Sequence, residues 1–433
     1  MLERFRHFLS IVFSGFWLLP TLLTGSSILI AYGSLYLDKR NAAWFASISR
    51  EISADGLRGI LDTSASATLT LAGLVFSSTL IALTLASSQY GPRLLHNFIR
   101  SRSNQVVLGM LLGNFIFALL VMRAVNEEFL PRFSCLLVFL STLASLAAFI
   151  YFVHHITNSL KAESIASSVA KDLDGDIERM FPDSLRPSSD ENAAESELEA
   201  WDDIDQEKSV PAVDSGYLQR VDIQSLIELT TKYDVRARVV VSPGQLVVRN
   251  SPILAYENDE QLSDEEVDRM RECFILGDRR TPEQDFEFRI RQLVEIAVRS
   301  LSPGINDPYT AINCIDLLAI SLSKVATRRL PRRIWRDSEG TVRLRTRPTS
   351  FRSILETAFL QLRHDGFSRA DVSITLFKAL LGIARSVECD EQFEAVYSMA
   401  MMFRDEALDG FSSTYDRECI EEIVADIEAM KKE

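Results

Sequence analysis

Residues 301–310 read Leu-Ser-Pro-Gly-Ile-Asn-Asp-Pro-Tyr-Thr, and this short run separates two strongly helical segments. Pro303 and Gly304 are expected to end the first helix, because both residue types disfavour a helix interior. Asp307 and Pro308 are expected to begin the second helix, since aspartate is a good N-cap and proline fits the first helical position. The run therefore predicts a rigid corner between two helices.

The corner also carries polar side chains that have two explanations. Ser302, Asn306 and Asp307 form a candidate ligand site, because a helix N-terminus attracts anions. The alternative is that these residues only hold the angle between the two helices. Ile305 and Asn306 neither end nor begin a helix in that account, so a function of the corner is expected to depend on them.

Helices are expected on both sides of the corner. Thr281 and Gln284 have the spacing of a capping box, which predicts a helix over residues 282–300, and Ser263 with Glu266 shows the same spacing earlier in the chain. Apolar residues at helical spacing predict a bundle in the rest of the chain. Its helices are expected at residues 308–326, 351–363, 369–387, 391–409 and 414–432.

A small β unit is expected over residues 215–260, before these helices. Short runs rich in β-branched residues, separated by proline and glycine, predict its strands. The part from Val241 to Tyr256 resembles half of a barrel-sandwich hybrid, the fold of biotinyl and lipoyl carriers. Such carriers need a lysine at the hairpin tip, and residues 234–256 contain none. The resemblance therefore implies a barrel-like structural or interaction module.

The first 160 residues differ in composition from the rest of the chain. They carry 11 Lys and Arg against 7 Asp and Glu, whereas residues 161–433 carry the other 35 of 46 and 53 of 60, so the net charges are +4 and −18. Four segments lack charged residues over about 20 positions or more, the length that crosses a bilayer. They lie between Arg6 and Asp38, Asp62 and Arg93, Arg102 and Arg123, and Arg132 and Lys161. We expect a four-helix transmembrane region at residues 1–160, with the lipid bilayer as its partner.

The second of these segments carries a polar stripe. Thr63, Thr70, Ser77 and Thr84 recur every seven residues, so they lie nearly on one face of a helix. Hydroxyl groups on such a face are suited to lining an ion path. The alternative is close helix packing, because small and hydroxylated residues let two backbones approach.

Basic residues and cysteines indicate the orientation in the membrane. An even number of spans places both termini on one side. The loop of residues 90–104 holds three arginines and no acid, and such loops stay in the cytoplasm. The five cysteines form no CxxC pair, which is typical of reduced cytoplasmic domains. We expect a multi-pass protein of the bacterial inner membrane with cytoplasmic termini.

Residues 161–214 are expected to form a helical extension followed by an acidic disordered linker, because residues 172–207 hold 14 acidic side chains. Asp172, Asp174 and Asp176 imitate the start of an EF-hand loop. Ile177 stands where that loop needs glycine, so calcium binding is not predicted.

A basic run follows the helix after the corner. It begins with Arg328, Arg329, Arg332 and Arg333 and continues to Arg347. One explanation is a contact with anionic lipid, and the other is an internal partner for acidic surfaces. The dipeptide Glu339-Gly340 inside the run predicts a hairpin.

The sequence contains no catalytic motif of a common class. GxSxG, HExxH, Walker and GxGxxG patterns are absent, and the five histidines are scattered. No enzymatic activity, metal or cofactor is therefore expected. The acidic balance of residues 161–433 argues against nucleic acid as a partner.

Three segments resemble a known bacterial family. They are Gln292–Ala297 with Leu301–Ala311, Ala86–Arg93 after the second apolar segment, and His154-His155 after the fourth. Together they are similar to a family of predicted membrane proteins known as domain of unknown function 2254. The resemblance implies an integral inner-membrane protein with a soluble C-terminal part, and it implies no activity, substrate or catalytic residue.

The sequence thus predicts a mainly α membrane protein, in which a four-helix transmembrane region precedes a soluble α+β domain. That domain would comprise the barrel-like β unit at 215–260 and a mainly helical bundle at 261–433. The expected function is an oligomeric channel or transport-type protein, a homo-oligomer with a cytoplasmic vestibule or gating domain. The alternative is a membrane-anchored scaffold or sensor that binds a partner or small ligand through the soluble domain.

Overall fold

The computed structural model describes residues 17–40, 53–90, 102–159, 161–181, 208–257, 262–330, 334–347, 349–411 and 413–431. The chain divides into two compact units. We call Met1–Ser164 the N-terminal unit and Ile165–Glu433 the C-terminal unit.

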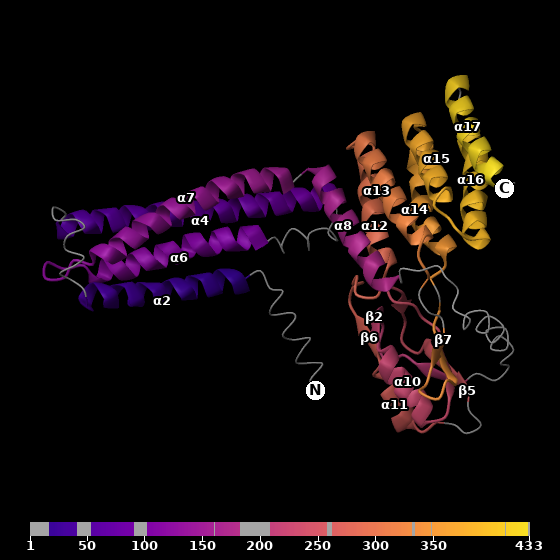
Figure 1. Ribbon diagram of the computed structural model, residues 1–433, viewed down its shortest axis with the longest axis horizontal. Helices are drawn as coiled ribbons and strands as arrows, with labels where there is room; N and C mark the ends of the chain where they lie inside the picture. Colours follow the sequence, from indigo (N-terminus) through magenta and orange to yellow (C-terminus); the bar gives the residue numbers. More distant parts are fainter. Residues whose placement is uncertain are drawn as a thin grey trace. The chain divides into compact units, whose positions relative to one another are not determined.

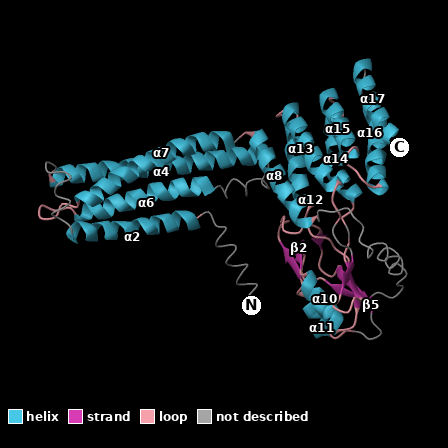
Figure 2. Cartoon of the chain, in the orientation of Figure 1, coloured by secondary structure: helices cyan, strands magenta, loops and turns pink. Residues whose placement is uncertain are grey.

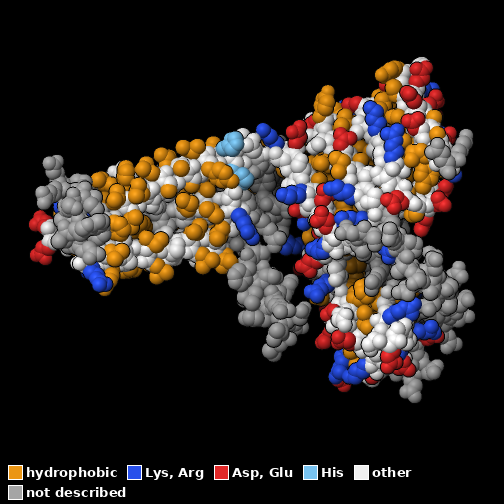
Figure 3. Space-filling model, in the orientation of Figure 1, with side chains coloured by type: hydrophobic (Ala, Val, Ile, Leu, Met, Phe, Trp, Pro, Cys, Tyr) orange, Lys and Arg blue, Asp and Glu red, His pale blue; other side chains and the backbone are white. Residues whose placement is uncertain are grey.

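Four long helices make up the described part of the N-terminal unit, and they run side by side in Figure 1. They are α2 (Leu18–Arg40), α4 (Ala54–Tyr90), α6 (Arg102–Ala124) and α7 (Arg132–Ser159). Helix α6 is central, because 56% of its apolar stretch is buried, against 17–22% in the other three. Figure 3 shows hydrophobic side chains along the outside of this unit. An apolar exterior of this extent suits a lipid environment.

Five helices are long and apolar enough to cross a membrane among the described residues. Four are the helices of the N-terminal unit, and the fifth is α13 (Pro308–Ala326) in the C-terminal unit. Half of the apolar stretch of α13 is buried, with Cys314, Ile315 and Leu318 inaccessible to solvent. We describe α13 as a core helix of its unit, and the number of four spans stays a prediction.

Two glycines allow α2 and α6 to pack closely. Gly109 and Gly113 lie one turn apart on α6. A methyl group at Gly109 would lie 3.0 Å from Pro20 Cα and 2.8 Å from Leu23 Cδ1, and one at Gly113 would collide with Ser27 Oγ. Small residues at such spacing are the usual means by which apolar helices approach each other in membranes.

A buried carboxylate joins the end of α2 to the start of α7. Asp38 is 2% exposed, and its two oxygens accept hydrogen bonds from the Phe133 N–H at 3.0 Å and the Ser134 N–H at 2.9 Å. The Ser134 hydroxyl donates to Asp38 at 2.6 Å and lies 2.9 Å from the Ser34 hydroxyl. The carboxylate therefore caps α7 from a neighbouring helix, and its charge is favourable at a helix N-terminus.

The C-terminal unit contains two β-sheets. One sheet has the strand order β1-β5-β3-β8-β7, and the other has the order β4-β2-β6. Their pairs are antiparallel except for β3 with β8, which is parallel. The bounds are β1 (Lys208–Pro211), β2 (Gly216–Val221), β3 (Arg236–Val239), β4 (Leu246–Val247), β5 (Pro252–Glu257), β6 (Phe274–Gly277), β7 (Ile334–Arg336) and β8 (Val342–Arg345).

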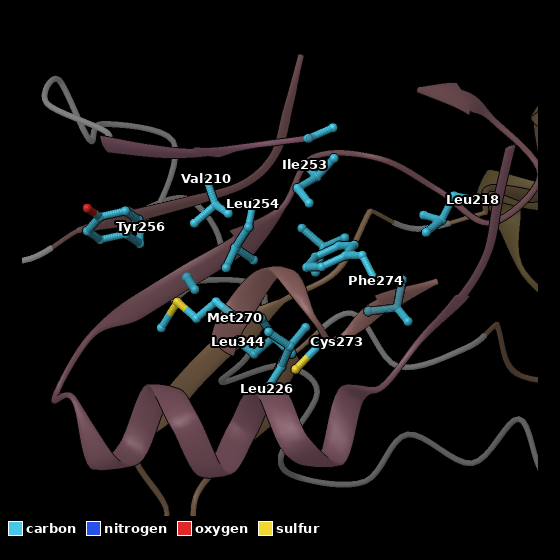
Figure 4. Close-up of a cluster of buried hydrophobic side chains, with 14 of the residues drawn as sticks. Val210, Leu218, Leu226, Ile253, Leu254, Tyr256, Met270, Cys273, Phe274 and Leu344 are labelled. Atoms are coloured by element: carbon cyan, nitrogen blue, oxygen red, sulfur yellow. The ribbon is translucent and has the colours of Figure 1, made fainter. Parts of the chain in front are cut away.

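One apolar core unites the sheets with helices α10 (Ile223–Lys232) and α11 (Asp264–Arg271). Figure 4 shows Leu226, Leu254, Met270 and Phe274 converging in it. Two sheets stand where the sequence suggested a small barrel, so the barrel-like unit is not confirmed. Strands β1, β6, β7 and β8 also fall outside residues 215–260. The predicted unit was too short because β8 pairs with β3 across a long stretch of chain, and such pairing leaves no local signal.

Six helices form three hairpins that stack in sequence order: α12 (Glu287–Leu301) with α13, α14 (Phe351–Gly366) with α15 (Ala370–Ala384), and α16 (Asp390–Gly410) with α17 (Thr414–Met430). Helices α13, α15 and α17 are neighbours in one layer, and α12, α14 and α16 are neighbours in the other. Figure 2 shows the sheets as a separate part of this unit. The expected bundle is therefore a two-layer stack, in which each hairpin packs on the next one along the chain.

The start of α12 differs from the expectation. The helix begins at Glu287 with no side-chain cap, five residues after the predicted start at Pro282. Gln284, expected to complete a capping box, instead binds strand β2: its Oε1 accepts the Val221 N–H at 2.9 Å, and its Nε2 donates to the Val221 carbonyl at 3.1 Å. A bond to a distant strand thus outcompeted the local cap. The second capping box, Ser263 with Glu266, is present at α11.

Helix α8 (Ala162–Met180) is held against the first hairpin by ion pairs. Asp172 and Asp176 lie 3.2 and 3.6 Å from Arg289 of α12, and Asp174 lies 2.5 Å from Lys324 Nζ of α13. The three aspartates that imitate an EF-hand are therefore helical and bind basic side chains. Burial raises the pKa of Asp176, while Arg179 and Arg289 act in the opposite direction.

Candidate functional site: a polar layer in the N-terminal unit

Two apolar clusters fill the interior of the N-terminal unit. The first contains Ala65 of α4, Phe117 of α6 and Val138 of α7. The second contains Ala72 of α4, Leu111 of α6 and Phe152 of α7. Helices α4, α6 and α7 contribute to both clusters, so the residues between the clusters along each helix define an intermediate level of the bundle.

Polar side chains occupy that level on all three helices, and we call them the polar layer: Thr68 of α4, Asn114 of α6, and Thr142 and Ser145 of α7. Asn114 is 2% exposed and Ser145 is 1% exposed. Each residue lies near the middle of its helix, which corresponds to the centre of a bilayer for a spanning helix. Buried polar groups at that depth are costly and mark candidate functional sites.

Hydrogen bonds satisfy only part of the polar layer. The Asn114 Nδ2 donates to Thr142 Oγ1 at 3.0 Å, and the Thr142 hydroxyl donates to the Val138 carbonyl at 2.8 Å. Thr68 donates to the Ser64 carbonyl one turn earlier at 2.8 Å. Asn114 Oδ1 and Ser145 Oγ have no hydrogen-bond partner among the described residues. The layer therefore links α6 to α7 and retains an acceptor and a hydroxyl that nothing in the described chain binds.

The polar stripe predicted on the second apolar segment lies elsewhere. Thr63, Thr70, Ser77 and Thr84 are all exposed on the outer face of α4. The three threonine hydroxyls donate to carbonyls of their own helix, one turn earlier, at 2.8–2.9 Å. Within one protomer the stripe lines no interior path, and it is available to lipid or to another protomer.

The corner at residues 301–310 is built largely by its own hydrogen bonds. Asp307 caps α13 by accepting from the Thr310 N–H at 3.2 Å and the Thr310 hydroxyl at 2.6 Å, and Ser302 Oγ donates to the Arg299 carbonyl at 2.6 Å. Asn306 has a left-handed backbone, with φ of 54°, and its Oδ1 accepts a hydrogen bond from Arg369 at the start of α15. Asn306 thus acquires a structural role, in connecting the first two hairpins.

Two apolar side chains of the corner remain exposed. Ile305 is 46% exposed, and Tyr309 is 80% exposed. Neither residue is needed for the caps described above. Both side chains are therefore accessible at the surface of the C-terminal unit.

The basic run is partly used inside the C-terminal unit. The Arg328 Nη1 donates to the Phe181 carbonyl at 3.1 Å, and Arg329 is half-buried. Arg332 and Arg333 lie outside the described residues. Later in the run, the predicted hairpin forms as β7 and β8, where Arg343 pairs with Asp234 and Asp337 at 2.6 and 2.8 Å.

The acidic and thiol groups form no cluster of three or more that would hold a metal ion among the described residues. Cys273 and Cys314 are buried, and burial raises the pKa of the Cys273 thiol to about 12. A thiol with so high a pKa is a poor nucleophile at neutral pH.

Sequence reasoning missed the polar layer because it searched the apolar segments for charged residues. A signal was available: Asn114 is a large amide in the middle of the run from Val106 to Val121, which is otherwise apolar or glycine. Its burial could not be read from that run, because the sequence does not say that α6 is the central helix.

Comparison with known proteins gives a family and two relatives. A sequence profile of the family described as predicted membrane protein (DUF2254) matches residues 14–381. An uncharacterized protein of Mycobacterium bovis is 28% identical over 430 residues, which cover 96% of this chain and 81% of that protein. An uncharacterized protein of Mycobacterium tuberculosis strain H37Rv shows the same identity and coverage. No solved structure matches the chain.

Proposed function

The chain belongs to the DUF2254 family of predicted membrane proteins, and on this premise we propose that it is a homo-oligomeric channel or transport-type protein. In this proposal the α4 helices of several protomers meet around a shared axis. The protein resides in the bacterial inner membrane with both termini in the cytoplasm, where the C-terminal unit forms a vestibule or gate.

The observation that supports this proposal most is the exposure of the whole α4 stripe. Thr63, Thr70, Ser77 and Thr84 extend along the outer face of the helix, and an added methyl group at Gly73, between them, would touch nothing within 4 Å. A row of small and hydroxylated residues on a lipid-facing surface suits close approach of a second helix. Hydroxyl groups at such a junction also supply oxygen ligands for a passing ion.

Cysteine cross-linking tests the α4 interface. Thr70→Cys is introduced into a chain in which Cys389 and Cys419 are serine, and the protein is oxidised in membranes. The matched control is Leu143→Cys, a 49% exposed position on α7. Disulfide-linked dimers are expected for Thr70→Cys and not for Leu143→Cys. Equal linking of the two variants, or none, contradicts an α4-centred assembly.

Ion flux into proteoliposomes tests transport itself. Wild type is expected to conduct under at least one of voltage, membrane tension or pH steps, and Thr70→Ala and Ser77→Ala are expected to alter that conductance. No conductance in wild type under any of these conditions would exclude the channel.

A second function is supported by the hairpin stack and the exposed corner. Stacked helical hairpins commonly present binding surfaces, and Ile305 and Tyr309 are exposed apolar side chains on this one. In this alternative the protein is a membrane-anchored scaffold or sensor. Affinity capture compares Tyr309→Ser with Tyr415→Ser, a 71% exposed tyrosine on α17. Loss of the same partner in both variants, or in neither, argues against the corner as the binding surface.

A further inference from the structure

The polar layer has an unbalanced set of hydrogen-bonding groups. Asn114 Oδ1 is an acceptor without a donor, and the Ser145 hydroxyl has neither a donor nor an acceptor among the described residues. Both residues are at least 98% buried, so bulk solvent does not reach them. Leaving buried polar groups unsatisfied costs free energy, and native proteins rarely do so.

Asn114 and Ser145 have a common neighbour in Thr142. Asn114 binds Thr142 directly at 3.0 Å, and Ser145 is one helical turn from Thr142 on α7. Residues three apart on a helix have side chains on the same face, with Cβ atoms about 5–6 Å apart. Asn114 and Ser145 therefore both flank Thr142, and one water molecule beside Thr142 is the smallest group that would bridge them.

We propose that the polar layer binds one ordered water molecule inside each protomer, which donates to Asn114 Oδ1 and accepts from the Ser145 hydroxyl. A water supplies both missing roles at once, because it is donor and acceptor together. The Thr142 oxygen has two lone pairs and, among the described residues, accepts only from Asn114 Nδ2, so the second lone pair can accept the other hydrogen of the water.

The chemistry of the layer favours water over a cation. Its side chains are one amide and three hydroxyls, and none carries a charge. A cation would leave the Ser145 proton without an acceptor and would place an unpaired charge in the middle of an apolar bundle. The water site lies between α6 and α7 within one protomer, and it depends neither on the exposed α4 stripe nor on an oligomer.

Radiolytic labelling in heavy-oxygen water tests the site on the full chain in detergent. A bound water oxidises side chains beside it even where bulk solvent does not reach. Leu111, one turn before Asn114, and Phe149, one turn after Ser145, are expected to incorporate label. Phe152, which is buried in the same apolar cluster as Leu111 but lies two turns beyond Ser145, is the internal control. If Leu111 and Phe149 incorporate no more label than Phe152, the proposal is overturned.

Thermal unfolding provides the second measurement. Ser145→Ala is expected to lower the midpoint by about 2–4 °C, as for the loss of one buried hydrogen bond in a unit of this size, and to remove the labelling. The control Ser26→Ala changes an exposed hydroxyl on α2, outside the α4 stripe, and is expected to leave both unchanged. An unchanged or raised midpoint for Ser145→Ala contradicts a bound water. If the unfolding midpoint rises in sodium or potassium chloride but not in the salt of a bulky organic cation, the site binds a monovalent ion and the water proposal is wrong.

Discussion

Because α2 packs closely on α6, alanine at Gly109 or Gly113 is expected to destabilise the protein. The methyl group of an alanine at Gly113 would collide with Ser27 Oγ. The methyl group of an alanine at Gly109 would lie 3.0 Å from Pro20 Cα. Gly33 lies on α2 with nothing within 4 Å of an added methyl group, so Gly33→Ala is the matched control.

The expected magnitudes follow from two opposing terms. Overpacking costs about 1–3 kcal/mol, and replacing a helical glycine by alanine returns about 1 kcal/mol. Gly113→Ala is therefore expected to lower the free energy of unfolding by about 1 kcal/mol, because the side chain of Ser27 can shift. Gly109→Ala is expected to lose about 2 kcal/mol, because the backbone of Pro20 cannot. Gly33→Ala is expected to gain up to about 1 kcal/mol.

Thermal unfolding of the purified chain in detergent measures these changes, at about 2–4 °C per kcal/mol for a unit of this size. Ser27→Ala removes the atom that an alanine at Gly113 would meet first, so it is expected to rescue Gly113→Ala and not Gly109→Ala. If both glycine variants behave like Gly33→Ala, or if Ser27→Ala rescues them equally, the close packing of α2 on α6 is wrong.

Three further changes test other parts of the structure. Asp38→Asn replaces a carboxylate that accepts three hydrogen bonds, so the free energy of unfolding is expected to fall by on the order of 3 kcal/mol. Amide exchange at Phe133 and Ser134 is expected to become faster, and unchanged exchange contradicts the cap. Gly244 and Gly340 have φ of 87° and 86°, and alanine costs about 1–2 kcal/mol from backbone strain at either. Gly244→Ala must also displace the ion pair of Arg280 with the buried Asp285, so its loss of unfolding free energy is expected to reach about 3 kcal/mol or more in chemical denaturation. An equal loss for Gly244→Ala and Gly340→Ala refutes this packing. The Arg343 guanidinium holds the pKa of Asp337 below its usual value, so the stability from this group is complete above about pH 4 and is lost as the pH falls toward the lowered pKa. Asp337→Asn is expected to flatten the pH dependence of unfolding below pH 4, and an unchanged profile rejects that assignment.

Local signals in the sequence predicted local structure well. The Asp307 cap, the capping box of Ser263 with Glu266, and the hairpin at Gly340 are all present, because each depends on residues within a few positions of one another. The box at Thr281 failed for an instructive reason. Gln284 had a distant alternative in the backbone of Val221, and a spacing rule cannot include a partner 63 positions away.

The same limit explains the candidate site. The periodicity of Thr63 and Thr70 located a stripe on α4, but it could not distinguish the outside of the bundle from the inside. Asn114 and Ser145 have no periodic relation, since they come together only through the pairing of α6 with α7. Burial on a central helix is a property of the assembled unit, and the polar layer became visible only there.

The parallel pairing of β3 with β8 has a consequence for synthesis on the ribosome. Strand β3 is made well before β8, and the first helical hairpin is encoded between them. Until Arg345 emerges, β3 has an open edge that can pair with another nascent chain. The five-stranded sheet therefore closes after α12 and α13 have been made, and chains that terminate within that interval are expected to aggregate.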